Sequence, residues 1–303
     1  MSMIRELVSV GIPTYNRAPL LRNALSSACA QTYKDLEIII SDNASTDAAV
    51  GDVIREFSAK DPRIKVLWQD VNKGPIQNFS SALLAASGKY FIWLADDDCW
   101  ESEYIECLVM GKQYSGAALV YGSAIGVEPD GAEYSIKTKM VSHCQPVLSL
   151  LNFMRADTDE VFYGLFDVSI GKKLIPVLKP WNLPGCISEK WPILEYNFSS
   201  YCFIYGLLSR GGFYRAGDGR CVHYRGVSKA QWSRPVWGGA HVYLLLGYIG
   251  IHLKMAFRFS SAGFRVGGLA GGLLGPFVSG ALFFTRLAKV LAVRKYRIMN
   301  SDK

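Results

Sequence analysis

The stretch Gly88–Trp100, GKYFIWLADDDCW, decides how the chain folds. Within it, Tyr90–Leu94 is a short apolar run rich in aromatic side chains, which predicts a buried β-strand. The run ends abruptly in Asp96-Asp97-Asp98. Three adjacent carboxylates repel one another, so the pattern indicates a cation, or a ligand that carries one, at the strand end. An acidic loop in solvent is the alternative, but open α/β sheets bind ligands at the ends of such strands.

Three apolar runs precede this strand, and each is followed by polar residues. Strands are predicted at Leu7–Ile12, Leu36–Ile40, Ile64–Trp68 and, further on, Val120–Gly126; helices are predicted at Arg17–Gln31, Val50–Phe57 and Ile76–Ala86. Strands that alternate with helices indicate an α/β fold with a Rossmann-like, mostly parallel sheet flanked by helices. One edge of such a sheet gathers the polar clusters Pro13–Asn16, Asp42–Asp47, Asn72–Gly74 and Asp96–Asp98.

The sequence contains neither GxGxxG nor GxxxxGK[ST], the two glycine-rich patterns that hold phosphate groups on backbone amides. A diphosphate bound at this edge would therefore need a metal ion, and the acids at 96–98 supply its ligands. The loop Asp42–Asp47 also contains helix-start signals: Ser45 or Thr46 fits an N-cap, and Asp47 fits a first-turn acid.

The charge of the chain is unevenly distributed. The 303 residues are 50% hydrophobic with a net charge of +7, and nine Lys or Arg residues but only one acid lie from Lys254 onward. Such a basic block suits an anionic membrane surface better than nucleic acid. The seven cysteines show no CxxC pair, and the N-terminus has no long apolar segment. Both features favour a cytoplasmic protein with reduced thiols.

Four motifs in order resemble the family 2 glycosyltransferases of GT-A fold: VSVGIPTYNR, EIIISDNASTD, the Asn-Lys-Gly turn and FIWLADDD. The resemblance is close over roughly residues 7–115. It implies a nucleotide-sugar donor, with a UDP-sugar favoured, a divalent metal (Mn²⁺ or Mg²⁺) and inversion at the anomeric carbon. The acceptor it implies is a hydroxyl of a lipid-linked or surface glycan.

The resemblance also implies roles for single residues at the donor site. Pro13, Tyr15 and Asn16 would frame the nucleobase, Asp42 would bind it, and Lys73 belongs to the Asn-Lys-Gly turn beside the donor; Asp96 would contact the ribose, and Asp97 and Asp98 would hold the metal. Many relatives have an acid where Ala95 stands, which leaves the register of the acid run open by one residue.

The second half is harder to interpret. Phe162–Phe166 resembles a segment of the acceptor-side half, and Glu189 falls where the family places its catalytic base, although the usual neighbouring acid is Lys190 here. Glu160, Asp159 and Glu195 are alternatives for the base. His223-Tyr224-Arg225 suits a phosphate contact or packing at a strand end.

Two apolar segments distinguish the tail. Val236–Leu253 and Val266–Phe284 lack charged residues, and the second contains overlapping GxxxG spacings from Gly267, Gly268 and Gly271. Each is at the lower limit for a membrane span. Because spanning would put basic residues on the outer side, we expect an in-plane or re-entrant hairpin at the cytoplasmic face of the membrane. A hairpin packed on the catalytic domain, or at a homo-oligomer interface, is the alternative.

These predictions divide the chain into three parts: 1–115 binds the nucleotide sugar, 116–234 forms the acceptor side, and 235–303 is the apolar, basic helical tail. The expected function is metal-dependent, inverting glycosyl transfer. A sugar nucleotidyltransferase is one alternative, although such enzymes carry a glycine-rich basic loop where Pro13–Arg17 stands. A catalytically inactive sugar-binding or scaffold protein is the other.

Overall fold

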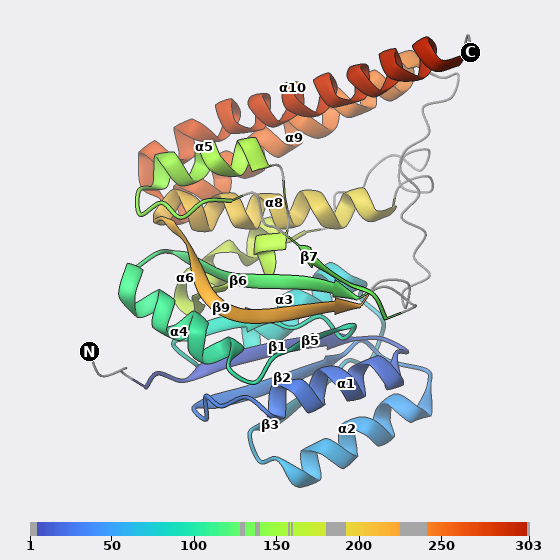
Figure 1. Ribbon diagram of the computed structural model, residues 1–303, viewed down its shortest axis with the longest axis vertical. Helices are drawn as coiled ribbons and strands as arrows, with labels where there is room; N and C mark the ends of the chain where they lie inside the picture. The colour runs from blue at the N-terminus through green and yellow to red at the C-terminus, as the bar shows by residue number, and fades with distance from the viewer. Residues whose placement is uncertain are drawn as a thin grey trace.

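A curled sheet forms the centre of the protein, with helices on either side of it (Figure 1). The computed structural model describes residues 5–127, 131–136, 140–156, 158, 160–179, 192–224 and 241–301. The strand order is β3-β2-β1-β4-β8-β6-β9-β5, with β7 paired to β6.

The first half is the predicted alternation of parallel strands and helices. Its strands β1–β4 pair in parallel in the order β3-β2-β1-β4, and every residue of β1 and β2 is buried. The elements are β1 (Val8–Thr14), α1 (Ala18–Cys29), β2 (Leu36–Asp42), α2 (Ala48–Lys60), β3 (Ile64–Trp68), α3 (Pro75–Ala85) and β4 (Tyr90–Trp93). The predicted strands and helices of this half are thus confirmed, with shifted ends for all of them except β3.

The whole sheet, however, is mixed rather than mostly parallel. Strand β8 (Leu165–Asp167) lies antiparallel between β4 and β6 (Leu119–Val127), and β9 (Phe213–Tyr224) runs parallel to β6. Two short antiparallel strands complete it: β7 (Glu133–Ile136) on β6 and β5 (Asp98–Trp100) on β9. The prediction of a mostly parallel sheet holds for the first half only, because its helical crossovers do not continue beyond β4.

The position of β5 requires the sheet to curl. Only five chain steps, spanning at most about 18 Å, join Trp93 of β4 to Asp98 of β5. In hydrogen-bond order the two strands are four spacings apart, which is about 19 Å on a flat sheet. The segment that contains Asp96 and Asp97 therefore bridges two distant strands of one sheet.

Aromatic packing joins the two halves. The indole of Trp93 stacks on Phe162 at 4.4 Å between ring centroids with 9° between the planes, and its Nε1 donates to the carbonyl of Phe79 at 3.2 Å. Phe166 and Phe203 complete this cluster around Trp93. The second-half helices are α4 (Tyr104–Ser115), α5 (Pro146–Ala156), η1 (Glu160–Tyr163), α6 (Val168–Leu174), η2 (Ile175–Val177) and α8 (Pro192–Arg210).

The buried carboxylate of Glu37 links several strands at the edge of the sheet opposite the polar clusters. Glu37 of β2 accepts hydrogen bonds from Ser9 of β1, from Lys65 Nζ of β3 at 2.6 Å, and from Ser87 and Gly88 in the turn before β4. Burial raises its pKa, but the bonds from Lys65, Ser9 and Ser87 outweigh that effect and lower the pKa to about 2.

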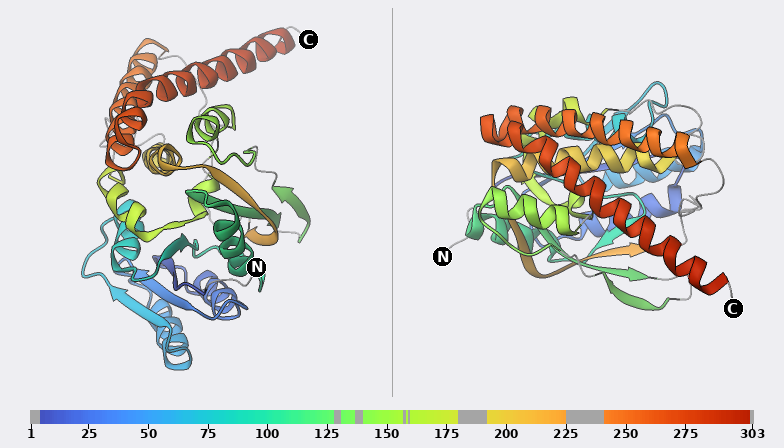
Figure 2. Two further views of the ribbon diagram at one scale, coloured as in Figure 1. Left: turned by 90° about the vertical axis from the view of Figure 1, so that its left-hand side faces the viewer. Right: turned by 90° about the horizontal axis from the view of Figure 1, so that it is seen from above.

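The tail is a hairpin of two long helices, α9 (His241–Val266) and α10 (Gly268–Ser301), which turns at Gly268 with φ +68°. None of the described helices is both long enough and apolar enough to cross a membrane. The hairpin packs on α8: Tyr205 stacks on Phe259 at 4.5 Å and donates a hydrogen bond to the carbonyl of Gly271. Figure 2 shows α9 and α10 diverging towards the C-terminus.

Candidate active site at the carboxyl edge of the parallel strands

The acid run lies at the carboxyl end of β4, beside the loop that follows β1. One guanidinium nitrogen of Arg17, Nη1, lies 3.0 Å from Asp96 Oδ1 and 3.2 Å from Asp97 Oδ2. Thr14 donates its hydroxyl to Asp96 Oδ2 at 2.8 Å. The chain thus supplies part of the positive charge that the sequence analysis assigned to a bound cation or ligand.

Asp96 and Asp97 differ in exposure, and this difference suits different roles. Asp96 is buried, and burial raises its pKa to about 6 against the lowering effect of Arg17 and Thr14. The side chain of Asp97 is 27% exposed. Burial would lower the pKa of Arg17, but the carboxylates of Asp96 and Asp97 outweigh it and raise that pKa. Asp96 is held in place, whereas Asp97 faces solvent.

Asp98 lies on the inner side of the run. It is buried and forms the first residue of β5, where its backbone pairs with His223 of β9. Burial raises the pKa of Tyr104 and of Tyr121 well above the usual range, and the nearby Asp98 carboxylate adds to both shifts. The third acid therefore lies towards the interior, next to tyrosines of the second half.

Asn16 joins the loops that follow β1 and β2. Its backbone adopts φ +55°, a conformation that asparagine tolerates, and its Oδ1 accepts hydrogen bonds from the amides of Thr46 and Asp47. Asp47, rather than Ser45 or Thr46, is the N-cap of α2, since it accepts from the amide of Ala49 at 3.0 Å. Asn16 is therefore a structural link as well as a candidate donor contact.

A second polar network ties the turn after β3 to its neighbours. Asn43 Oδ1 accepts from the amide of Lys73 at 2.9 Å, and Asn43 Nδ2 donates to Asn72 at 2.8 Å. The ammonium group of Lys73 is exposed and reaches Gln69 Oε1 at 3.0 Å. The network fixes Gly74, whose φ of +80° favours glycine, at the start of α3.

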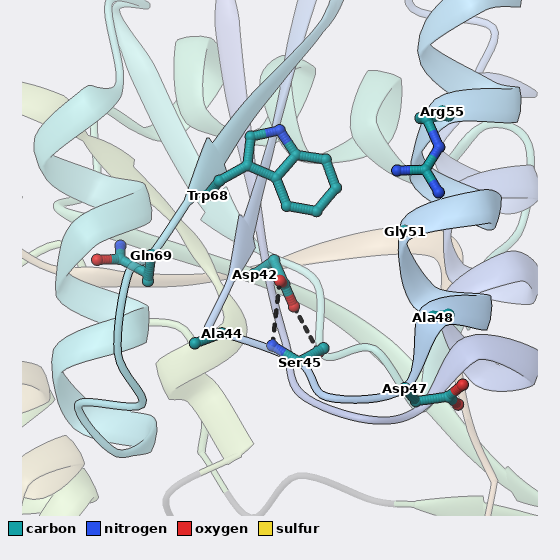
Figure 3. A pocket seen from close by; sticks show the side chains of 9 residues that line it. All are labelled: Asp42, Ala44, Ser45, Asp47, Ala48, Gly51, Arg55, Trp68 and Gln69. Carbon is teal, nitrogen blue, oxygen red and sulfur yellow. Dashed lines mark hydrogen bonds between the residues drawn. The ribbon is translucent and has the colours of Figure 1, made fainter.

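Asp42 lines a pocket of about 380 Å³ beside the edge strand β3 (Figure 3). Its carboxylate accepts from the amide and hydroxyl of Ser45, and the indole of Trp68, 52% exposed, lies beside it. The lining residues are Asp42, Ala44, Ser45, Asp47, Ala48, Gly51, Arg55, Trp68 and Gln69. Tyr15 is 39% exposed and does not belong to this lining, and Pro13 is buried within β1.

Only some of the candidate bases lie within the described residues. Glu189 and Asp159 lie outside the described residues, and Glu195 falls within α8. Glu160 begins η1, whose last residue, Tyr163, lies close enough to Arg17 to help raise its pKa. Tyr163, in the segment 162–166, therefore lies near Arg17, which pairs with the acid run.

The residues at this edge suit a divalent cation held jointly with a diphosphate. Mg²⁺ commonly binds proteins through one or two carboxylates together with substrate phosphates. Asp97 offers a solvent-facing carboxylate for this purpose, and Arg17 offers a cation beside it. Within the described ranges, no group of three His, Cys, Asp or Glu side chains could hold a metal by itself.

Sequence reasoning missed Arg17 and Trp68. The sequence analysis includes Arg17 in the VSVGIPTYNR motif and at the start of a helix but assigns it no role, although a cation three residues after a strand end can reach acids at the neighbouring strand end. Trp68 was treated as the end of a strand. Trp68 lies directly across from Asp42 in the register of β2 and β3. This position can be inferred from the sequence by aligning the two strands so that the polar residues at their carboxyl ends lie side by side.

Comparisons with known proteins bear on the family and the fold. The family model "Glycosyl transferase family 2" matches residues 9–198. The chain is 39% identical over 167 residues to the GalNAc(5)-diNAcBac-PP-undecaprenol beta-1,3-glucosyltransferase of Campylobacter jejuni. This match covers 54% of this chain and 52% of that protein. The chain is also 32% identical over 117 residues to the UDP-Glc:alpha-D-GlcNAc-diphosphoundecaprenol beta-1,3-glucosyltransferase WfgD of Escherichia coli. This match covers 39% of this chain and 45% of that protein. The chain thus spans about half the length of these relatives.

The solved structure of S. aureus TarS residues 1–349 superposes with a TM-score of 0.61 at 16% identity, over 89% of this chain and 72% of that one. The same protein in complex with UDP-GlcNAc gives a TM-score of 0.58. At this identity the likeness shows a shared fold. Because the family model matches well over half of the residues, this chain belongs to glycosyl transferase family 2.

Proposed function

We propose that the protein transfers a sugar, with inversion, from a UDP-sugar to a hydroxyl of a lipid-linked glycan, and that a divalent metal is required. One observation carries the proposal: Asp96, Asp97 and Arg17 meet at the carboxyl edge of the parallel strands, where α/β sheets bind ligands. The names of the relatives support the choice of substrates, since two contain diphosphoundecaprenol or PP-undecaprenol and one names UDP-Glc.

The donor would lie across the ends of β1, β2 and β4. Asp42 can accept a hydrogen bond from the N3–H of uracil, and Asp96 can accept one from a ribose hydroxyl once it is ionised. Tyr15 and Trp68 each offer an exposed ring that could stack on the base. Lys73, exposed in the turn after β3, adds positive charge on the donor side.

The departing diphosphate requires positive charge at the acid run. Asp97 would hold the metal, Mn²⁺ or Mg²⁺, because it faces solvent while Asp98 lies inward. When bound, the metal would supply Lewis-acid stabilisation of the leaving nucleoside diphosphate. Arg17 would place its guanidinium next to the same phosphates, where a bidentate donor suits their oxygens.

A carboxylate base must take the proton from the acceptor hydroxyl, which is a poor nucleophile while protonated. Glu189 remains our proposed base, with Glu160, Asp159 and Glu195 as alternatives. Attack on the face opposite the leaving diphosphate inverts the anomeric carbon.

The test is a turnover assay on the full chain. UDP release would be measured with UDP-glucose and UDP-GlcNAc, with GDP- and dTDP-sugars for comparison, in Mn²⁺, in Mg²⁺ and in excess chelator. Adding a polyprenyl-diphosphate oligosaccharide should raise UDP release and yield a product with an inverted anomeric linkage. Absence of release with every donor would overturn the transfer, and chelator-insensitive activity would overturn the metal requirement.

A further inference from the structure

The α9–α10 hairpin exposes large apolar side chains on its outer surface. On α9 these are Leu253, Phe257 and Phe264, which are 68%, 76% and 50% exposed. Their spacing of four and seven residues places them on one face of the helix. Met255 and Phe259, on the opposite face, are buried, and Phe259 stacks on Tyr205 of α8. The exposed face of α9 therefore points away from the catalytic part of the molecule.

The same pattern repeats on α10. Leu269, Leu273, Phe277 and Phe284 are between 59% and 74% exposed and share one face by their helical spacing. The opposite face is buried, with Gly271 against α8 and α9. Figure 1 shows the two helices as the outermost layer, at the end of the molecule opposite α2. We call the seven exposed side chains of α9 and α10 the outer apolar face.

The charge of the hairpin indicates what covers this face. Residues 241–301 contain eight Lys or Arg residues and no Asp or Glu. Arg265 is exposed and lines a surface hollow of about 420 Å³ together with Phe257 and Phe264. A second copy of the chain would bring two positively charged faces together, which is unfavourable in a symmetric interface. An anionic lipid surface complements both the apolar and the basic character.

We infer that the outer apolar face docks in the plane of an anionic membrane. The leucine and phenylalanine side chains lie at the boundary between headgroups and acyl chains, and Arg265, beside Phe257 and Phe264, contacts the anionic headgroups. The helices lie along the membrane surface. The contact needs neither donor nor acceptor, so it stands or falls independently of the proposed transfer reaction.

The test is flotation of the full-length protein with vesicles of phosphatidylcholine, with and without phosphatidylglycerol. The wild-type protein should float with the anionic vesicles and bind the neutral ones at least tenfold more weakly. High salt should loosen the binding only in part, because the apolar contact is not screened.

Two double variants localise the contact. Phe257→Glu with Phe277→Glu should weaken binding to anionic vesicles at least tenfold. Leu84→Glu with Met110→Glu makes the same charge change at side chains that are 57% and 56% exposed on α3 and α4, and should bind like the wild type. Thermal melts of both variants check folding, and Arg265→Gln, a third variant, should weaken binding to anionic vesicles more than to neutral ones.

Equal binding by the two double variants, or a wild-type protein that ignores vesicles, would overturn the inference. A wild-type dimer that ignores vesicles and that Phe257→Glu with Phe277→Glu converts to a monomer would identify the face as a contact between copies instead.

Discussion

A single guanidinium shared by two carboxylates dominates the electrostatics of the candidate site. Arg17 lies within 3.2 Å of both Asp96 and Asp97, so the protein carries its own counter-charge at this edge. A carboxylate that faces solvent beside a fixed cation is suited to exchange that partner for another positive group, such as a metal with its phosphates. Asp97, rather than Asp96, has that freedom.

We predict that Asp97→Asn abolishes transfer and weakens metal-dependent UDP binding while the fold survives. The amide keeps the shape of the side chain but removes the charge that a metal requires, and it also relieves repulsion from Asp96. Donor hydrolysis and nucleotide titration with and without Mn²⁺ measure the effect. Asp52→Asn, on the exposed surface of α2, is the control and should behave as wild type. Full activity of Asp97→Asn would contradict the assigned role.

The proposed contact with the nucleobase depends on a single residue, Asp42. We predict that Asp42→Ala raises the Michaelis constant for the donor about 10- to 100-fold and changes turnover at saturation little. A contact far from the anomeric carbon acts mainly as uniform binding. Because Asp42 also holds the loop through Ser45, Ser45→Ala is the matched control and should have a much smaller effect.

The two rings near Asp42 can be separated in the same titrations. Trp68→Ala removes the ring that lines the Asp42 pocket, and Tyr15→Ala removes the ring that the family resemblance assigns to the base. Whichever substitution weakens UDP binding as much as Asp42→Ala does identifies the ring that stacks on the base. An unchanged Michaelis constant in Asp42→Ala would rule out the base contact itself.

At the scale of elements, Glu37 joins β1, β2 and β3 to the turn before β4. We predict that Glu37→Gln lowers the free energy of unfolding by about 2–3 kcal/mol at pH 7. Because the folded pKa, about 2, is below the unfolded value, 4.5, this stabilisation is present above the unfolded pKa. It is lost as the pH falls from about 5 towards 2.

Denaturant melts of wild type and variant between pH 3 and pH 7 check this prediction, and the two curves should converge towards acid pH. Glu56 is the control, since Arg22 and Lys60 also lower its pKa to about 2, but the group lies at the surface of α2. Solvent screens such pairs, so Glu56→Gln should change stability little. A pH-independent difference for Glu37→Gln would contradict the electrostatic explanation.

Sequence periodicity predicted the elements whose signal is local. β3 was predicted with its observed ends, Ile64–Trp68, because an apolar run bounded by turn residues is sufficient. β5 was missed, since its three residues form a strand only by pairing with β9, more than a hundred residues later. For the same reason the sheet was expected to be mostly parallel. At the site, the strand-end acids were predictable, but the ion pair with Arg17 depends on side-chain placement that spacing does not encode.

At the scale of the whole molecule, glycines set how closely the tail helices approach. Gly271, which begins one of the GxxxG spacings noted in the sequence, packs closely against Gly263 of α9: a Cβ on Gly263 would lie 2.2 Å from the carbonyl oxygen of Gly271. We predict that Gly263→Ala destabilises the protein by about 1–3 kcal/mol, because backbone must move to admit the methyl group.

Gly280→Ala is the matched control on α10, since a Cβ there meets no atom within 4 Å. It should be neutral or stabilising by up to about 1 kcal/mol through helix propensity. Thermal melts of the two variants test the packing directly. Equal stability of both would show that the hairpin is looser than described.

The pairing of β5 with β9 has a consequence for the order in which the fold forms during synthesis. His223 follows Asp98 by 125 residues, so the acid run leaves the ribosome well before the strand that anchors it. At about 5–20 residues per second, that interval is roughly 6–25 s. Throughout it, the nascent chain carries the acid run without the strand that pairs with Asp98. The β5–β9 ladder can therefore form only after β9 has been synthesised, and a chain interrupted before β9 would lack the strand that pairs with Asp98.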